Sequence, residues 1–82
     1  MAYEADLSLE AMRRICKKAG AERVSKSATL ELAEVLNEVG IKIAKEAIEY
    51  TLYAGRKTVR AKDIKAAYEK LFKSKKPYSF QS

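Results

Sequence analysis

One long helical stretch constrains this sequence more than any other feature. Between Ser25 and Ala54 there is no proline, and Gly40 is the one residue that weakens a helix. Apolar residues recur along the stretch in steps of four and three, the spacing of one face of an α-helix. They are Leu32, Leu36, Val39, Ile43, Ala47, Tyr50 and Ala54. The pattern predicts a helix of about 28 residues, roughly 42 Å long.

A helix of this length is too long for its own chain to enclose. The chain has 82 residues, and a compact globule of that size is only roughly 30 Å across. Two flanking helices of about 12 residues would each span roughly 18 Å. We therefore expect a second copy to cover part of the apolar face, in an intertwined dimer. A bundle of up-and-down helices fits less well, because the helix lengths do not match. Gly40 suggests a close backbone contact at mid-helix.

Two shorter helices are expected, one on each side of the long one. Ser8 is suited to cap the first, predicted over 8–19, and Gly20 to end it. Ser25 or Ser27 would cap the long helix, and Gly55 would end it. The third is predicted over 61–73, with Asp63 in its first turn and Pro77 preventing any extension. The fold class is therefore all-α, with a head of residues 1–6, one domain over 7–73 and a basic tail over 74–82.

The charge favours a polyanionic partner. The formal net charge is +6, and residues 56–82 alone carry a net +7. A basic chain of this kind is suited to nucleic acid, although a merely solvated face is the alternative. The single Cys and the absence of His leave no set of metal ligands and no His-based catalysis. No apolar run is long enough to span a membrane. We expect no enzyme, no cofactor, no membrane partner and no small-molecule substrate.

Two segments resemble the loops of archaeal histones. They are Ala19-Gly-Ala-Glu-Arg-Val-Ser25 and Ala54-Gly-Arg-Lys-Thr-Val-Arg-Ala-Lys-Asp-Ile64, and their separation matches that family without a gap. The similarity extends over roughly residues 7–72. It implies the histone fold over 7–73, with the long helices of a head-to-tail homodimer crossing one another. It also implies compaction of double-stranded DNA without sequence preference, on the chromosome in the cytoplasm (the nucleoid). The alternative is a subunit of a heterodimeric transcription or replication factor.

The resemblance also implies roles for individual residues. Arg23 would enter the DNA minor groove, and Arg14 would contact phosphate from paired first helices. Lys57 and Thr58 of the partner would lie beside Arg23 and bind the same stretch of phosphates. The complete expected DNA-binding set is Arg13, Arg14, Lys17, Arg23, Lys57 and Thr58.

Further residues would hold the fold and the assembly together. Arg56 and Asp63 match a pair that clamps the second loop onto the third helix; an exposed, weak ion pair is the alternative. The expected contact between dimers consists of Tyr50, Tyr53, Asp63 and Ala66. Tyr53 stands where the family commonly has His, and its hydroxyl would donate to Asp63 of the neighbouring dimer. Alternatively, both Tyr rings pack within their own dimer.

The sequence also departs from the family on one side of the long helix. Ile41 and Leu52 occupy positions that are often charged in archaeal histones. They are 11 residues apart, almost three full turns, and so share a side of the helix. The departure leaves apolar surface where the family usually has solvated residues.

Overall fold

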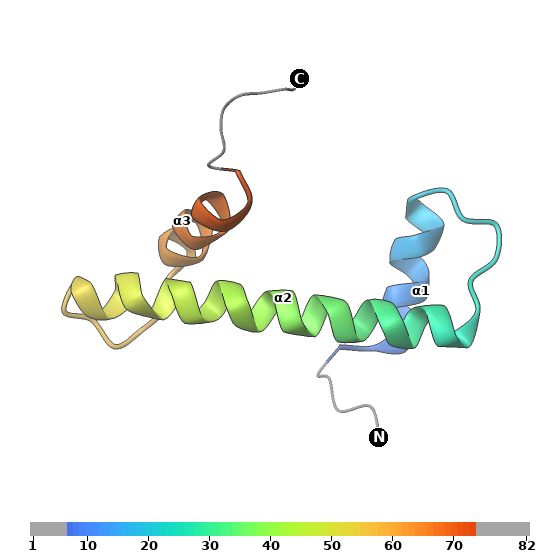
Figure 1. Cartoon of the computed structure of the whole chain (residues 1–82), viewed down its shortest axis with the longest axis horizontal. Helices are drawn as coiled ribbons and strands as arrows, with labels where there is room; N and C mark the ends of the chain where they lie inside the picture. Colours follow the sequence, from blue (N-terminus) through green and yellow to red (C-terminus); the bar gives the residue numbers. More distant parts are fainter. Residues whose placement is uncertain (1–6, 74–82) are drawn as a thin grey trace. The chain divides into compact units, whose positions relative to one another are not determined.

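The computed structural model describes residues 7–73, which form three α-helices (Figure 1). Helix α1 covers Leu9–Lys18, α2 covers Lys26–Tyr53, and α3 covers Ala61–Phe72. No strand occurs between residues 7 and 73. The all-α class and the order of short, long and short helices are confirmed. The predicted head over 1–6 and basic tail over 74–82, with Pro77, lie outside the described residues.

Serine side chains cap the first two helices. Ser8 Oγ accepts a hydrogen bond from the Ala11 N–H at 3.1 Å, and Ser25 Oγ accepts one from the Ala28 N–H at 3.1 Å. Each bond satisfies one of the N–H groups that have no partner within their helix. Ser25, rather than Ser27, is therefore the residue that caps α2.

Glycines end α1 and α2 in the same way. Gly20 has φ 114° and Gly55 has φ 76°, in the left-handed region that favours glycine. After α1, the Ala21 N–H donates to the Cys16 carbonyl. After α2, the Arg56 N–H donates to the Thr51 carbonyl. Both are Schellman ends, which turn the chain sharply out of the helix. Each loop therefore begins at a backbone position that the sequence fixes with a glycine.

The chain divides into two compact units, residues 1–40 and residues 41–82, which are described separately. In the first unit the buried residues are Met12 of α1 with Thr29 and Ala33 of α2. In the second they are Ala47 and Thr51 of α2 with Asp63 and Ala67 of α3. Small side chains dominate both sets, so each unit buries little apolar surface of its own.

Many large apolar side chains remain exposed in the single chain. They are Ile15, Val35, Ile41, Ile48, Leu52, Tyr53, Val59, Ile64, Tyr68 and Phe72. A Cβ added to Gly40 would meet no atom within 4 Å, so nothing between residues 7 and 73 explains this glycine. The close contact expected there is therefore not made by the described part of the chain itself.

Candidate nucleic-acid interface

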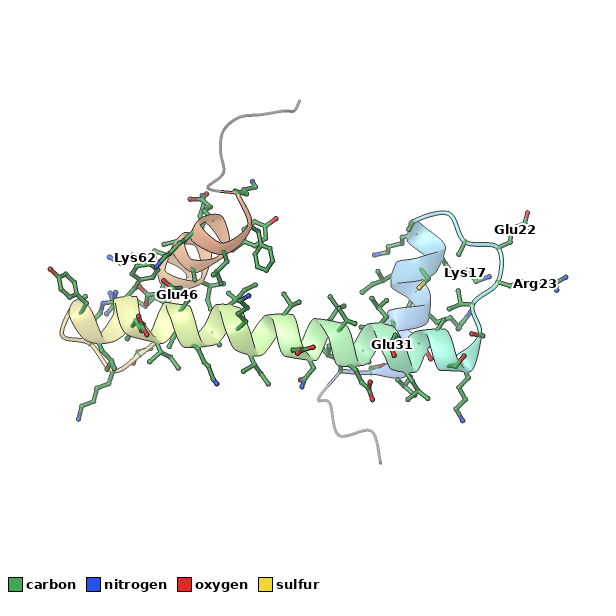
Figure 2. The ribbon with its side chains drawn as sticks, viewed as in Figure 1. Lys17, Glu22, Arg23, Glu31, Glu46 and Lys62 are labelled. Atoms are coloured by element: carbon green, nitrogen blue, oxygen red, sulfur yellow. The ribbon has the colours of Figure 1, made fainter. Side chains whose placement is uncertain are left out.

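The loop between α1 and α2 presents Arg23 to solvent. Lys17 Nζ, on the last turn of α1, donates a hydrogen bond to the Glu22 carbonyl at 2.6 Å. This bond ties the loop to the helix that precedes it. The Arg23 side chain extends away from the loop (Figure 2) and is exposed. The loop therefore presents the exposed guanidinium of Arg23, while the ammonium of Lys17 already donates one hydrogen bond to the backbone.

Arg13 and Arg14 of α1 differ in their surroundings. Arg13 is paired with Glu10, with 2.7 Å between Arg13 Nη2 and Glu10 Oε2. The hydrogen bonds from Arg13 lower the pKa of the Glu10 carboxyl. Arg14 is exposed and makes no hydrogen bond with the described residues. Arg14 is therefore the more available of the two cations for an external anion.

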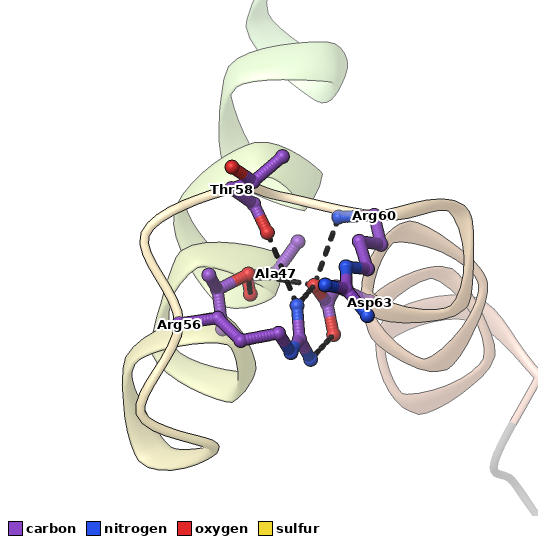
Figure 3. A network of polar contacts seen from close by, with 6 residues as sticks. Ala47, Arg56, Thr58, Arg60 and Asp63 are labelled. Atoms are coloured by element: carbon purple, nitrogen blue, oxygen red, sulfur yellow. Dashed lines mark hydrogen bonds and ion pairs between the residues drawn. The ribbon is translucent and has the colours of Figure 1, made fainter.

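The loop between α2 and α3 is organised around the carboxylate of Asp63 (Figure 3). Arg56 forms a two-pronged ion pair with it, because Nη1 donates to Oδ2 and Nη2 donates to Oδ1, both at 2.9 Å. The Arg60 N–H donates to Oδ2 at 2.9 Å, and Thr51 Oγ1 lies 2.7 Å from the same oxygen. Loop, α2 and α3 therefore meet at one buried carboxylate, which is only 3% exposed.

The charged form of Asp63 is strongly favoured. The hydrogen bonds from Arg56 lower the pKa of this carboxyl most, followed by those from the Arg60 N–H and Thr51, while burial opposes them. Asp63 also satisfies the N–H of Arg60, the residue that precedes α3. A complete capping box would also need the Arg60 side chain to accept a hydrogen bond from the Asp63 N–H. A guanidinium has only donors, so only half of a capping box is made.

The network presents Lys57 and Thr58 at the surface. Arg56 Nη1 also donates to the Thr58 carbonyl at 3.1 Å, which fixes the backbone between the two ends of the loop. The side chains of Lys57 and Thr58 are exposed. The structure thus brings these two expected DNA-binding residues together in one unit, residues 41–82. Arg13, Arg14, Lys17 and Arg23 belong to the other unit.

The residues expected at the contact between dimers differ widely in exposure. Tyr53 is 95% exposed, so its ring packs against nothing substantial in the described part of its own chain. Tyr50 is half-buried and Ala66 is exposed. Asp63 is buried, and its Oδ2 already accepts from three donors. Oδ1 carries fewer hydrogen bonds, because within the described residues it accepts from Arg56 Nη2 alone.

Sequence reasoning missed two contributors to this region. The first is Thr51, which follows Ala47 by one helical turn on a line of small residues. Its hydroxyl also lies 3.0 Å from the Ala47 carbonyl. The second is the ion pair between Lys70 Nζ and Glu46 Oε2 at 2.8 Å, which links α3 to α2. No sequence signal indicates this pair, because its members are 24 residues apart.

Residues 7–73 contain no group of three or more His, Cys, Asp or Glu residues placed to hold a metal ion. None of the helices described in that range has the length and apolar character needed to cross a membrane.

Comparison with known proteins identifies the family. The family described as histone-like transcription factor (CBF/NF-Y) and archaeal histone matches residues 5–68, which include both loops. A subunit of the archaeal histone HAN1 of Thermococcus zilligii is 48% identical over 63 residues, covering 77% of this chain and 94% of that protein. Probable archaeal histone 3 of Methanocaldococcus jannaschii is 44% identical over 63 residues, with the same coverage. The three helices and both loops are those of the histone fold, and the chain belongs to the family of histone-like transcription factors and archaeal histones.

Proposed function

We propose that this chain binds and compacts double-stranded DNA without sequence preference, as an archaeal-type histone that acts as a homodimer. The observation that carries the proposal is the family match over residues 5–68, which spans both loops. The net charge of +6 agrees with a polyanionic partner. As a DNA-packaging protein, the chain would reside on the chromosome.

The sparse cores support dimerisation. Between residues 7 and 73, the buried side chains other than Met12 and Asp63 are those of Ala and Thr, whereas ten large apolar side chains in the same range are exposed. Burying such side chains against a second copy is worth about 1.5–3 kcal/mol for each one fully covered. Gly40 lies at the middle of α2 and leaves its backbone open, so a second α2 could approach it closely. We propose that the two long helices cross near this glycine.

The dimer would bind DNA through its loops and its first helices. Two loops of opposite chains would lie together, so that Arg23 of one chain flanks Lys57 and Thr58 of the other. These groups would bind phosphates and the minor groove, which position DNA without reading its bases. Arg14 would add a phosphate contact. Arg13 and Lys17 would contribute less, because Glu10 and the Glu22 carbonyl already engage them.

A gel-shift titration at several salt concentrations tests the proposal. If one dimer neutralises about 6–10 phosphates, log K should fall with log salt at a slope of about −5 to −9. Lys57→Ala should weaken binding to every sequence alike and reduce the slope. Arg23→Ala should weaken binding most on DNA whose minor groove narrows on bending.

Lys65→Ala is the matched control for the titration. It removes the same charge from an exposed position on α3, outside both loops. It should bind DNA almost as the unaltered protein does. A strong preference of the unaltered protein for one unbent sequence would contradict the proposal.

A heteromeric assembly is the second candidate. One relative carries the word subunit in its name, which describes that protein as part of a larger assembly. Sedimentation of the purified chain distinguishes the two possibilities. A soluble dimer that shifts mixed-sequence DNA supports the homodimer, whereas an unfolded or aggregated chain rescued by a second histone-fold chain supports the heterodimer.

A further inference from the structure

An apolar stripe runs along the C-terminal half of α2. Ile41, Ile48 and Leu52 are 49%, 42% and 61% exposed. Lys45 lies between Ile41 and Ile48 on the same side of the helix. The four residues of the stripe, Ile41, Lys45, Ile48 and Leu52, therefore follow one another in steps of four, three and four, which is the spacing of a coiled-coil seam. All four residues belong to the unit of residues 41–82. Exposed apolar side chains aligned along one side of a helix mark an interaction surface.

The stripe lies on the side of α2 opposite to the proposed dimer face. Successive residues of an α-helix are about 100° apart, so residues two positions apart are separated by about 200°. Ile41 is therefore turned away from Ile43, and Ile48 from Tyr50. The partner copy that covers the face of Ile43 and Tyr50 leaves the stripe open. This step depends on the dimer proposed above.

We propose that the stripe docks onto the same stripe of a chain in a second dimer, with the two α2 helices antiparallel. In that arrangement Ile41 of each chain meets Leu52 of the other across a two-fold axis. Lys42 and Glu49 both lie along one edge of the stripe. The same two-fold axis therefore places Lys42 of each chain beside Glu49 of the other. The surface is therefore complementary to itself in charge as well as in apolar character.

Lys45 is compatible with this seam. It is exposed, and it makes no ion pair with the described residues. In the antiparallel arrangement it lies opposite Ile48 of the other chain. The aliphatic part of a lysine side chain packs on apolar surface while its ammonium group stays at the edge. That edge is where Glu49 of the other chain lies.

The contact would operate on DNA rather than in free solution. A few side chains on each helix bury much less than the roughly 1,600 Å² of a standard stable interface. Free dimers, each carrying twice the +6 of a chain, also repel one another. DNA neutralises that charge and holds dimers at high local concentration, which favours a weak contact. The contact would thereby join dimers bound to neighbouring DNA segments.

Cross-linking on DNA tests the geometry. Lys45→Cys in a Cys16→Ser background places a thiol next to the two-fold axis, about 4.5 Å along the helix from its counterpart. A short bis-maleimide should join two chains when long mixed-sequence DNA is present and not in its absence. Glu69→Cys, an exposed position on α3, is the control that should not cross-link. Equal linkage without DNA would place Lys45 inside the dimer and overturn the proposal, as would a lack of linkage on DNA that the unaltered protein shifts.

A charge exchange tests the pairing between Lys42 and Glu49. Lys42→Glu or Glu49→Lys is added to the protein that carries Lys45→Cys and Cys16→Ser. Each should lower the cross-linking yield about fivefold, because the two-fold axis makes two copies of the pair and each substitution breaks both. The exchanged double variant keeps the net charge and should restore the yield. A double variant as weak as the singles would overturn the proposal. If the unaltered protein shifts DNA and these variants all link equally, the stripe contact fails while the proposed DNA binding stands. If the unaltered protein does not shift DNA, the proposed function itself fails.

Discussion

Thr51 Oγ1 lies 2.7 Å from Asp63 Oδ2, although the two residues are 12 positions apart and belong to different helices. The contact joins α2 to the first turn of α3 beneath the loop that carries Lys57. The same carboxylate is held by Arg56, whose side chain is 17% exposed. The pair is therefore shielded from water, unlike the surface ion pairs that contribute little to stability. The shape of the loop therefore depends on Thr51, Arg56 and Asp63, which are not among the residues expected to bind DNA.

Removing the Thr51 hydroxyl should destabilise the protein. Thr51→Val keeps the shape of the side chain but deprives the buried carboxylate of one donor, at a cost of about 1–3 kcal/mol. The free energy of unfolding in urea measures this loss. Thr58→Val, at an exposed position of the loop, is the matched control and should change it by less than about 0.5 kcal/mol. Equal effects of the two substitutions would mean that the buried hydrogen bond between Thr51 and Asp63 does not stabilise the fold.

Stability should depend on pH through Asp63. The pKa of the Asp63 carboxyl is lowered in the folded state. Its stabilising contribution is therefore complete above the pKa that this carboxyl has in the unfolded chain, about 3.9. That contribution is lost progressively as the pH falls below this value. Asp63→Asn should therefore have a lower melting temperature than the unaltered protein at pH 7. The gap should narrow on acidification, because protonation then removes the same charge.

Comparison of the two melting curves isolates Asp63, since the other carboxylates titrate in both proteins. Melting temperatures followed by circular dichroism between pH 7 and pH 2 give the measurement. A gap that stays constant over this range would show that the charge of Asp63 does not stabilise the fold.

The helices and loops were predictable because their signals are local. Ser8, Gly20 and Gly55 act on backbone groups within a few residues of themselves, so sequence spacing is enough to place the helix ends. The role of Thr51 was not predictable, because its partner lies on another helix and a threonine on a line of small residues has many possible neighbours. Burial of Asp63 escaped prediction for a related reason. An acidic residue in a first helical turn usually faces water, and only the arrangement of Arg56, Thr51 and the Arg60 N–H encloses it.

Folding and dimerisation should be one event. The melting temperature should then rise with protein concentration over a hundredfold range, because the proposed folded state is a dimer and the unfolded state is not. Ile43→Asp would bury an unpaired charge in the dimer and should abolish folding. Ile41→Asp is the matched control, since Ile41 is exposed on the opposite side of α2, and it should retain the fold. A melting temperature independent of concentration would exclude an obligate dimer.

Tyr53 should join dimers along DNA. Its exposed ring provides apolar area at the end of α2, and Tyr53→Lys would place a cation against a positively charged neighbour. The variant should keep its fold and protect only the length of DNA covered by one dimer from nuclease digestion. Tyr53→Phe keeps the ring and loses the hydroxyl. It should keep longer protected fragments if the ring, rather than a hydrogen bond to Asp63, makes the contact. Long fragments with Tyr53→Lys would exclude this contact.

The most direct measurement of DNA compaction follows the end-to-end length of a single tethered, mixed-sequence DNA molecule while the purified protein is added. The net charge of +6 and the two loops of the histone fold predict a progressive shortening that reverses when salt is raised. Arg23→Ala combined with Lys57→Ala should shorten the DNA much less at the same concentration. An unchanged or lengthened DNA at concentrations that saturate a gel shift would contradict the proposal that this chain compacts DNA.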